Sequence, residues 1–234
     1  MIVQWLNNLG LPPDPHDKPR VGVSACLLGD AVRYDGDHKC DSLVSDVLSP
    51  WFEAVRLCPE VAIGLPVPRP PIQVVQLGDE QRVRRVNDPS LEYGGALRDH
   101  AASQDAALDG FILKARSPSC GVGTTPVHDA HGQELHARGN GAFADALLDR
   151  GLAAPVVNES HLMTPPAQQL FLLQIHLHRA WRTGQTVPRT QWQRTLGVLP
   201  RPIAEQLASW LDRLMHADGT GPVLQSPQAT SGAP

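Results

Sequence analysis

The cysteines are the residues of this chain best suited to bind a metal or to react, and there are four of them. They are Cys26, Cys40, Cys58 and Cys120. None belongs to a close C-x₂-C pair, the spacing typical of structural zinc sites. Three thiolates can instead hold a four-iron cluster and leave its fourth iron as a Lewis acid for a substrate that carries sulfur or a small chelating group. The competing interpretation is structural, since a free cysteine often packs as a small buried hydrophobe.

Three of these cysteines lie at the ends of segments that the sequence predicts to be buried strands. The segments are residues 21–28 with Cys26, residues 53–61 with Cys58, and residues 110–114 shortly before Cys120. Ligands of a parallel α/β sheet bind beyond the carboxyl ends of its strands. We therefore expect the three thiols to meet at one rim of one sheet.

Further helix-like and strand-like segments alternate along the same part of the chain. Helical patterns occur in residues 41–52, 92–108 and 140–150, and strand-like runs in residues 72–76 and 154–157. Such alternation is typical of parallel α/β proteins. It predicts an α/β fold with a mainly parallel, Rossmann-like sheet flanked by helices, plus a small α-helical C-terminal extension.

Changes in composition and in the spacing of hydrophobic residues divide the chain into four parts. Residues 1–19 are predicted to form an N-terminal appendage with a short amphipathic helix, and residues 20–160 the α/β domain. Residues 161–217 are predicted to form an extension of two main helices, because leucine, isoleucine and tryptophan recur there at helical spacing. Residues 218–234 are rich in Gly, Ser, Pro, Gln and Thr and are predicted to be a disordered tail.

The overall composition is that of a globular protein: 234 residues, of which 41% are hydrophobic and 19% charged. No apolar run approaches the roughly 20 residues of a membrane helix. The first residues lack the basic and apolar regions of a secretory signal. The formal net charge of −4 argues against a strongly basic nucleic-acid-binding protein. These features predict a cytoplasmic protein in a reducing compartment, where disulfides are rare.

Five short motifs contain the three strand-end cysteines or lie between them. They are SACLLG at residues 24–29, VRYDG at 32–36, CPEV at 58–61, GLPVPRPP at 64–71 and KARSPSCG at 114–121. In this order and at these spacings, the motifs closely resemble those of the bacterial thiouracil desulfidase family. The resemblance covers about residues 20–160, so both terminal parts of the chain lie outside it.

The resemblance implies an enzyme that removes sulfur from a thiolated pyrimidine. The family binds a [4Fe–4S] cluster through three cysteines, which match Cys26, Cys58 and Cys120. The open iron takes the thiocarbonyl sulfur, water replaces the sulfur by oxygen, and sulfide leaves, so the reaction is a hydrolysis of a C–S bond. The implied substrate is thiouracil or a nucleotide such as thiouridine monophosphate. Thiolated tRNA is a further candidate partner. Cys40 has no counterpart among the cluster ligands.

The resemblance also implies two catalytic side chains, Glu60 and Ser117. Glu60 lies two residues after Cys58, which keeps it near the cluster, and it can take a proton from the attacking water as a general base. Ser117 lies three residues before Cys120, and its hydroxyl can donate to a ring nitrogen or to the developing anion. The structural alternative for Ser117 is a turn cap before Pro118.

Five further residues are predicted to contact the substrate: Ser24, Arg33, Tyr34, Arg69 and Ser119. Arg33, Tyr34 and Arg69 are suited to hold a ring carbonyl or a nucleotide phosphate. The alternative for these three is a structural role in salt bridges or loop packing, because arginine serves both purposes. Ser119 is also suited to bond the cluster sulfides and tune the cluster potential.

The residues alone, without the resemblance, are also compatible with other functions. One is a non-catalytic iron–sulfur or zinc sensor whose helical extension binds a partner or nucleic acid, although Glu60 and Ser117 would then have no assigned purpose. Another is a metal-free hydrolase with a cysteine nucleophile of low pKa. We expect no membrane association and no obligate protein partner. The histidines of one polar, glycine-containing region are interpreted as parts of an exposed loop rather than as metal ligands: His128, His131 and His136.

Overall fold

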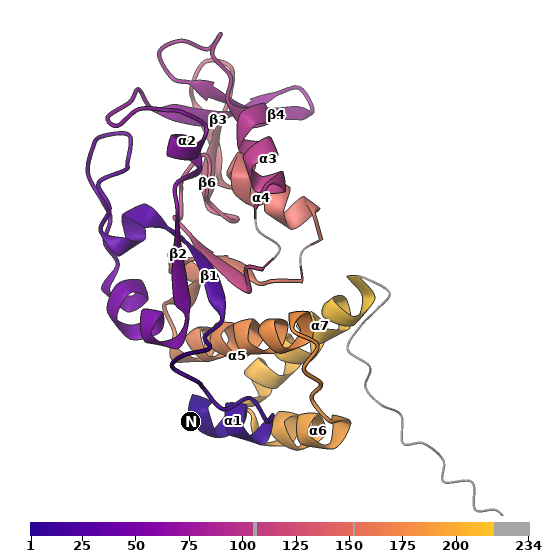
Figure 1. Ribbon diagram of the computed structural model, residues 1–234. Helices are drawn as coiled ribbons and strands as arrows, with labels where there is room; N and C mark the ends of the chain where they lie inside the picture. Colours follow the sequence, from indigo (N-terminus) through magenta and orange to yellow (C-terminus); the bar gives the residue numbers. More distant parts are fainter. Residues whose placement is uncertain (105–106, 152, 218–234) are drawn as a thin grey trace, which may run out of the picture.

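The computed structural model describes residues 1–104, 107–151 and 153–217 (Figure 1). The tail that is predicted to be disordered, residues 218–234, lies outside the described residues. In the described ranges, no helix is long and apolar enough to cross a membrane. Strands of this part of the chain form two four-stranded sheets, and helices surround them.

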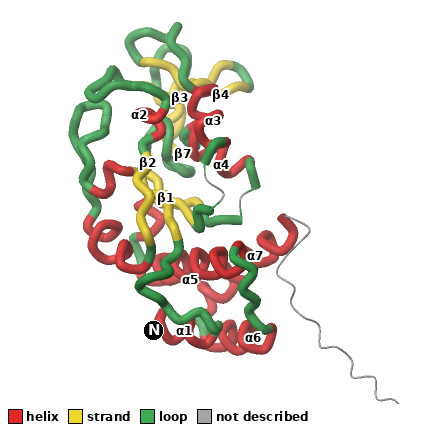
Figure 2. Tube along the Cα trace, viewed as in Figure 1, coloured by secondary structure: helices red, strands yellow, loops and turns green. Residues whose placement is uncertain are grey.

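The first sheet is entirely parallel and, with the helices around it, confirms the predicted α/β class. Its strand order is β2-β1-β5-β8. The bounds are β1 Arg20–Ser24, β2 Glu53–Leu57, β5 Gly110–Leu113 and β8 Val156–Asn158. All four residues of β5 are buried, which is why this segment reads as a continuous apolar run. Because the strands are parallel, their carboxyl ends lie at one edge of the sheet. Figure 2 shows two of its neighbouring strands, β1 and β2, side by side.

A second sheet is present in addition to the single sheet that the sequence predicts. Its order is β4-β3-β6-β7, with one parallel pair between two antiparallel pairs. The bounds are β3 Ile72–Leu77, β4 Glu80–Arg85, β6 Thr125–His128 and β7 Glu134–Gly139. The strand predicted at residues 72–76 is therefore confirmed, but as part of this sheet.

The interpretation of the histidine region as a loop is wrong for two of its residues. His128 lies on β6 and His136 on β7. The edge strands β4 and β7 read EQRVRR and ELHARG, and most of their side chains are exposed. They therefore lack the apolar alternation by which a half-buried strand is recognised in a sequence.

Helices of the described chain pack against both sheets. The α-helices are α1 Ile2–Asn8, α2 Pro59–Ala62, α3 Gly94–Ala102, α4 Ala142–Asp149, α5 Pro165–Arg182, α6 Arg189–Val198 and α7 Arg201–Ala217. The predicted helix at residues 41–52 forms instead the π-helical turn η2 (Leu43–Leu48) and the 3₁₀ turn η3 (Ser49–Trp51). Pro50 explains part of this difference, because it has no N–H to continue an α-helix. Helix α6 adds a third helix to the two that are predicted after residue 160.

Helix α5 joins the parallel sheet to the other C-terminal helices. On the sheet, Val21 and Ile112 pack against Phe171 and Ile175 of α5. A Cβ at Gly110 would lie 2.7 Å from the Ile175 side chain, so only glycine permits this close approach. The opposite side of α5 packs with α1, α6 and α7, which lie beside it in Figure 1. The domain boundary expected at residue 160 thus lies just before α5, a helix whose side chains share a hydrophobic core with the parallel sheet.

Asp109, which precedes β5, fixes α5 to the sheet through polar contacts. Its buried carboxylate accepts hydrogen bonds from the Arg20 N–H at 2.9 Å and from Arg182 Nε at 2.9 Å, and it contacts His178 Nδ1 at 3.2 Å. Burial opposes ionisation of this carboxyl group, but the hydrogen bonds from His178, Arg182 and Arg20 outweigh it and lower the Asp109 pKa. Asp109 therefore stabilises the fold in its charged form.

We expect Asp109→Asn to lower the free energy of unfolding by about 3 kcal/mol, because Arg182 loses a buried charged partner. The folded-state pKa lies below the unfolded value, so this contribution is complete above about pH 4 and is lost as the pH falls further. Urea unfolding at neutral pH and near pH 3 measures both effects. The exposed pair Arg201–Glu205 provides the control, since Glu205→Gln should change stability by less than about 1 kcal/mol. Equal effects of the two variants would contradict this role of Asp109.

Candidate functional site

A cavity of about 490 Å³ lies at the carboxyl ends of β1, β2 and β5. The side chains of Cys26, Cys58 and Cys120 all line it, as their positions after three parallel strands predict. All three are free thiols. Cys40 is exposed and is not among the lining residues. The structure thus separates three convergent cysteines from the fourth.

Each of the three cysteines is presented by a short turn that follows its strand. Cys26 lies in the 3₁₀ turn η1 (Ala25–Leu28), and Cys58 directly precedes helix α2. Cys120 lies in a tight turn that contacts the start of α4, where the Ala142 N–H donates to the Pro118 carbonyl oxygen at 3.0 Å. A Cβ at Gly141, just before α4, would lie 2.4 Å from the Ser119 carbonyl carbon. Only glycine, which has no side chain, can lie this close to the backbone of the turn.

Ser117 caps the turn that carries Cys120. Its Oγ accepts hydrogen bonds from the backbone N–H of Cys120 at 3.1 Å and of Ser119 at 3.2 Å. The structural alternative that the sequence suggests for Ser117 is thus present. Because the oxygen acts as acceptor in both bonds, the hydroxyl hydrogen is still available as a donor, and Ser117 also lines the cavity.

Glu60 lies in the same cavity, on the first turn of α2, with both carboxylate oxygens engaged. Arg69 Nε donates to Oε2 at 2.7 Å, and Ser119 Oγ donates to Oε1 at 2.9 Å. The Arg69 side chain is only 4% exposed, and that of Glu60 12%. The structure therefore places two of the predicted substrate contacts, Arg69 and Ser119, against Glu60.

The remaining predicted contacts are a buried serine and a more exposed arginine–tyrosine pair. Ser24 is buried and its Oγ accepts from the Lys114 N–H at 2.9 Å. Arg33 forms an ion pair with Asp35 at 3.0 Å and lies over the Tyr34 ring at 5.5 Å. Tyr34 is 45% exposed, and both residues line the cavity.

Burial raises the pKa values of all three thiols. Burial, followed by the negative charge of Cys58, raises the pKa of Cys26 to about 11, against the opposing charges of Lys114 and Arg33. Burial also raises the pKa values of Cys58 and Cys120, and a hydrogen bond with Ser24 partly offsets this effect at Cys120. A catalytic cysteine nucleophile needs a lowered pKa. The raised values thus oppose the interpretation as a metal-free cysteine hydrolase.

Positive charge surrounds the thiols. Five cationic side chains line the cavity, and Glu60 is the carboxylate among its described lining residues. The cations are Arg33, Lys39, Arg69, Lys114 and Arg116. Thiolates and the sulfides of a cluster are negative, and nearby cations stabilise such charge.

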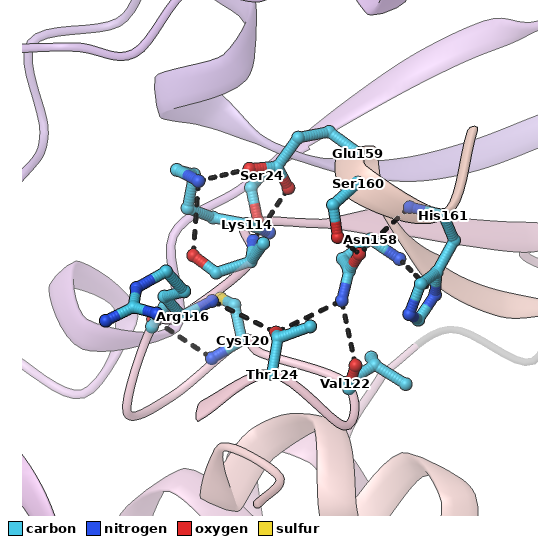
Figure 3. A network of polar contacts seen from close by, with 12 residues as sticks. Ser24, Lys114, Arg116, Cys120, Val122, Thr124, Asn158, Glu159, Ser160 and His161 are labelled. Carbon is cyan, nitrogen blue, oxygen red and sulfur yellow. Dashed lines mark hydrogen bonds and ion pairs between the residues drawn. The ribbon is translucent and has the colours of Figure 1, made fainter. Parts of the chain in front are cut away.

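Lys114 and Glu159 form a charged pair that reasoning from the sequence misses. Lys114 Nζ contacts Glu159 Oε1, and the other Glu159 oxygen accepts from the Ala115 N–H at 2.6 Å (Figure 3). Lys114 is the last residue of the predicted strand, 110–114, and directly follows β5 in the structure, so its position near the site could have been noticed in the sequence. Glu159 is 45 residues away from Lys114, and only the parallel pairing of β5 with β8 brings the two together.

Arg116 is a second residue that the sequence does not single out as a contact. Its backbone lies in the left-handed region, at φ 61°, where residues other than glycine are uncommon. The Arg116 N–H donates to Thr124 Oγ1 at 3.1 Å, and the exposed side chain lines the cavity. A strained backbone of this kind often occurs at functional sites.

The donor set fits an iron–sulfur cluster with three protein ligands. Thiolates are the usual ligands of such clusters. Three free thiols share the cavity, and the fourth cysteine lies outside it. Within the described residues, no three His, Cys, Asp or Glu side chains converge closely enough to hold a single metal ion.

Comparisons with known proteins identify a family and two similar proteins. A family model described as 2-thiouracil desulfurase matches residues 21–159. A solved structure of a [4Fe-4S]-dependent thiouracil desulfidase, TudS, is 33% identical, with a TM-score of 0.49 over 62% of this chain and 93% of that chain. The uncharacterised protein YbbK of Bacillus subtilis (strain 168) is 28% identical over 149 residues, which are 60% of this chain and 95% of YbbK. Since the family model spans more than half of the chain, the protein belongs to the 2-thiouracil desulfurase family.

Proposed function

We propose that this protein is a [4Fe–4S]-dependent desulfidase that replaces the thiocarbonyl sulfur of a thiolated pyrimidine by oxygen. The observation that carries the proposal is the convergence of Cys26, Cys58 and Cys120 in one cavity that also holds a carboxylate, Glu60. The three thiols are assigned as the cluster ligands. Membership of the family supports the choice of a thiouracil-like substrate.

A [4Fe–4S] cluster held by three protein thiolates supplies an iron with an open position, which is a Lewis acid with a preference for sulfur. The overall reaction is not a redox reaction. Water adds its oxygen to the thiocarbonyl carbon, the C–S bond breaks, and the sulfur leaves as hydrosulfide or hydrogen sulfide. The products are the oxygen-containing pyrimidine and one sulfide.

The chain contributes proton transfer and orientation. Glu60 takes a proton from the attacking water at one of its carboxylate oxygens, as a general base. Ser117, whose oxygen is fixed by two backbone N–H groups, donates its hydroxyl hydrogen to the ring nitrogen or to the anion that develops on the substrate. The cations at the cavity mouth, Arg33 among them, attract a polar or anionic substrate.

Turnover by an anaerobic, iron- and sulfide-reconstituted preparation tests this proposal. We expect the thiocarbonyl absorbance of 2-thiouracil, 4-thiouracil or 4-thiouridine monophosphate to disappear, with release of one sulfide per molecule. The same preparation without iron is the control and should leave the absorbance unchanged. If about four irons are bound per chain and none of the three compounds reacts, the assignment of the substrate is wrong and a sensor is the better interpretation.

A further inference from the structure

Arg69 is an arginine inside the wall of the cavity rather than at its mouth. The residue is 7% exposed, and it belongs to the proline-rich segment of residues 64–71. Burying a guanidinium group is costly unless its charge is paired and its N–H groups are bonded. The partners of Arg69 therefore indicate what the residue is for.

Those partners come from three different segments of the chain. Nε donates to Glu60 at 2.7 Å, and Nη1 donates to the carbonyl oxygens of Val32 at 3.0 Å and Pro66 at 3.2 Å. The Arg69 N–H donates in addition to the Tyr34 carbonyl oxygen at 2.8 Å. One side chain and its backbone thus fix the loop after β1, the helix that begins after Cys58, and the proline-rich segment relative to one another.

Ser119 holds the other oxygen of the same carboxylate. It is fully buried, and its Oγ donates to Glu60 Oε1 at 2.9 Å. Its backbone N–H donates to Ser117, the second predicted catalytic side chain, at 3.2 Å. Ser119 therefore connects Glu60 to the turn that carries Ser117 and Cys120.

We infer that Arg69 and Ser119 are positioning residues for Glu60 rather than contacts to the substrate. This inference rests on the proposed function, in which Glu60 is the general base. A carboxylate has about four acceptor sites, so two held hydrogen bonds still leave it able to accept from water. Fixing both oxygens orients these remaining sites, and a misplacement of about 1 Å in such a group can reduce the rate on the order of 100-fold.

A double-mutant cycle in the reconstituted enzyme separates positioning from substrate binding. The variants are Arg69→Gln, Glu60→Gln and the double variant, with rates expressed per bound cluster. We expect Arg69→Gln to lower kcat by about 100-fold with little change in KM, and the double variant to be no slower than Glu60→Gln alone. A direct contact to the substrate would instead raise KM, and the two losses in kcat/KM would multiply.

Conservative variants test the geometry. Arg69→Lys keeps the charge but loses the planar set of donors that reaches Glu60 and two carbonyl oxygens together, so it should recover only part of kcat. Ser119→Ala should lower kcat, and Ser119→Thr, which keeps the hydroxyl, should restore it. Full activity of Arg69→Gln or Ser119→Ala would overturn the inference.

Thermal unfolding of the metal-free chain provides a readout that does not depend on turnover. If Arg69 acts through Glu60, the loss of Tm in the double variant should be smaller than the sum of the two single losses. The ion pair of Arg84, on β4, with Glu92 involves no described residue of the cavity lining and is the control, and Arg84→Gln should leave kcat unchanged. An inactive wild type with a full complement of iron contradicts the proposed function. Additive losses of Tm, or multiplied losses of kcat/KM in an active enzyme, contradict only the positioning role.

Discussion

Replacing Cys120 by serine is expected to reduce the iron content from about four per chain to less than one and to abolish turnover. Cys120 is a buried residue that supplies one of the three thiols lining the cavity, and the remaining cysteine, Cys40, is exposed and outside the cavity, so it cannot take the place of Cys120. A serine hydroxyl is a much poorer ligand for iron than a thiolate. Iron and acid-labile sulfide analysis after anaerobic reconstitution measures the effect, and Cys26→Ser and Cys58→Ser should behave in the same way.

Cys40 offers a matched control for these substitutions. Its thiol is exposed and lies 3.9 Å from Ser45 Oγ, outside the cavity. Cys40→Ser should therefore keep both the iron content and the rate of the wild type. If Cys120→Ser retained the full cluster while Cys40→Ser lost it, the assignment of the ligands would be wrong.

Replacing Glu60 by glutamine is expected to leave the iron content unchanged and to lower kcat by about 10²- to 10⁴-fold, the usual contribution of a general base. Glutamine has nearly the same shape and keeps one oxygen for a hydrogen bond, but it cannot take a proton from water. Steady-state rates at saturating thiouracil, divided by the bound iron, separate this effect from a loss of cluster.

Glu53 is the control for this variant. It lies on β2 in the same part of the chain, and 64% of its side chain is exposed. Glu53→Gln should change neither the iron content nor kcat. A Glu60→Gln enzyme with the kcat of the wild type would show that another group removes the proton from water.

The convergence of the three thiols in one cavity is predictable from the sequence, because it depends on the strand pattern directly before each cysteine. Each cysteine follows a segment with a clear strand pattern, and parallel strands end at a common edge. The buried runs of β1 and β5 are sufficient to predict that Cys26 and Cys120 lie near each other. Glu60 needs no separate prediction of position, because it lies two residues after Cys58.

The partners of these residues are not predictable in the same way. Arg69 pairs with Glu60 through a proline-rich segment without a regular pattern, and Lys114 pairs with Glu159 from the end of another strand. Such contacts depend on how segments pack in three dimensions, and single side chains carry no periodic signal. The same limit applies to the second sheet, whose exposed edge strands β4 and β7 are too polar to be recognised.

The C-terminal helices have a defined structural relation to the site, although they lie outside the matched family region. Helix α5 packs on one face of the parallel sheet and is tied to Asp109, directly before β5. Strand β5 in turn leads to Lys114 and the turn of Cys120. Loss of the Asp109 contacts is therefore expected to affect stability first, and the geometry of the cavity only through the position of β5.

The origin of the oxygen in the product tests the central claim most directly. The reconstituted protein would react with a thiolated pyrimidine in water enriched in heavy oxygen, with analysis of the product by mass spectrometry and parallel measurement of sulfide. We predict one heavy oxygen atom in each product base and one sulfide released per base, both dependent on Cys26, Cys58 and Cys120. A product without the label, or sulfur loss that persists in the Cys120→Ser variant without iron, would contradict desulfuration by water at a cluster held by these three thiols.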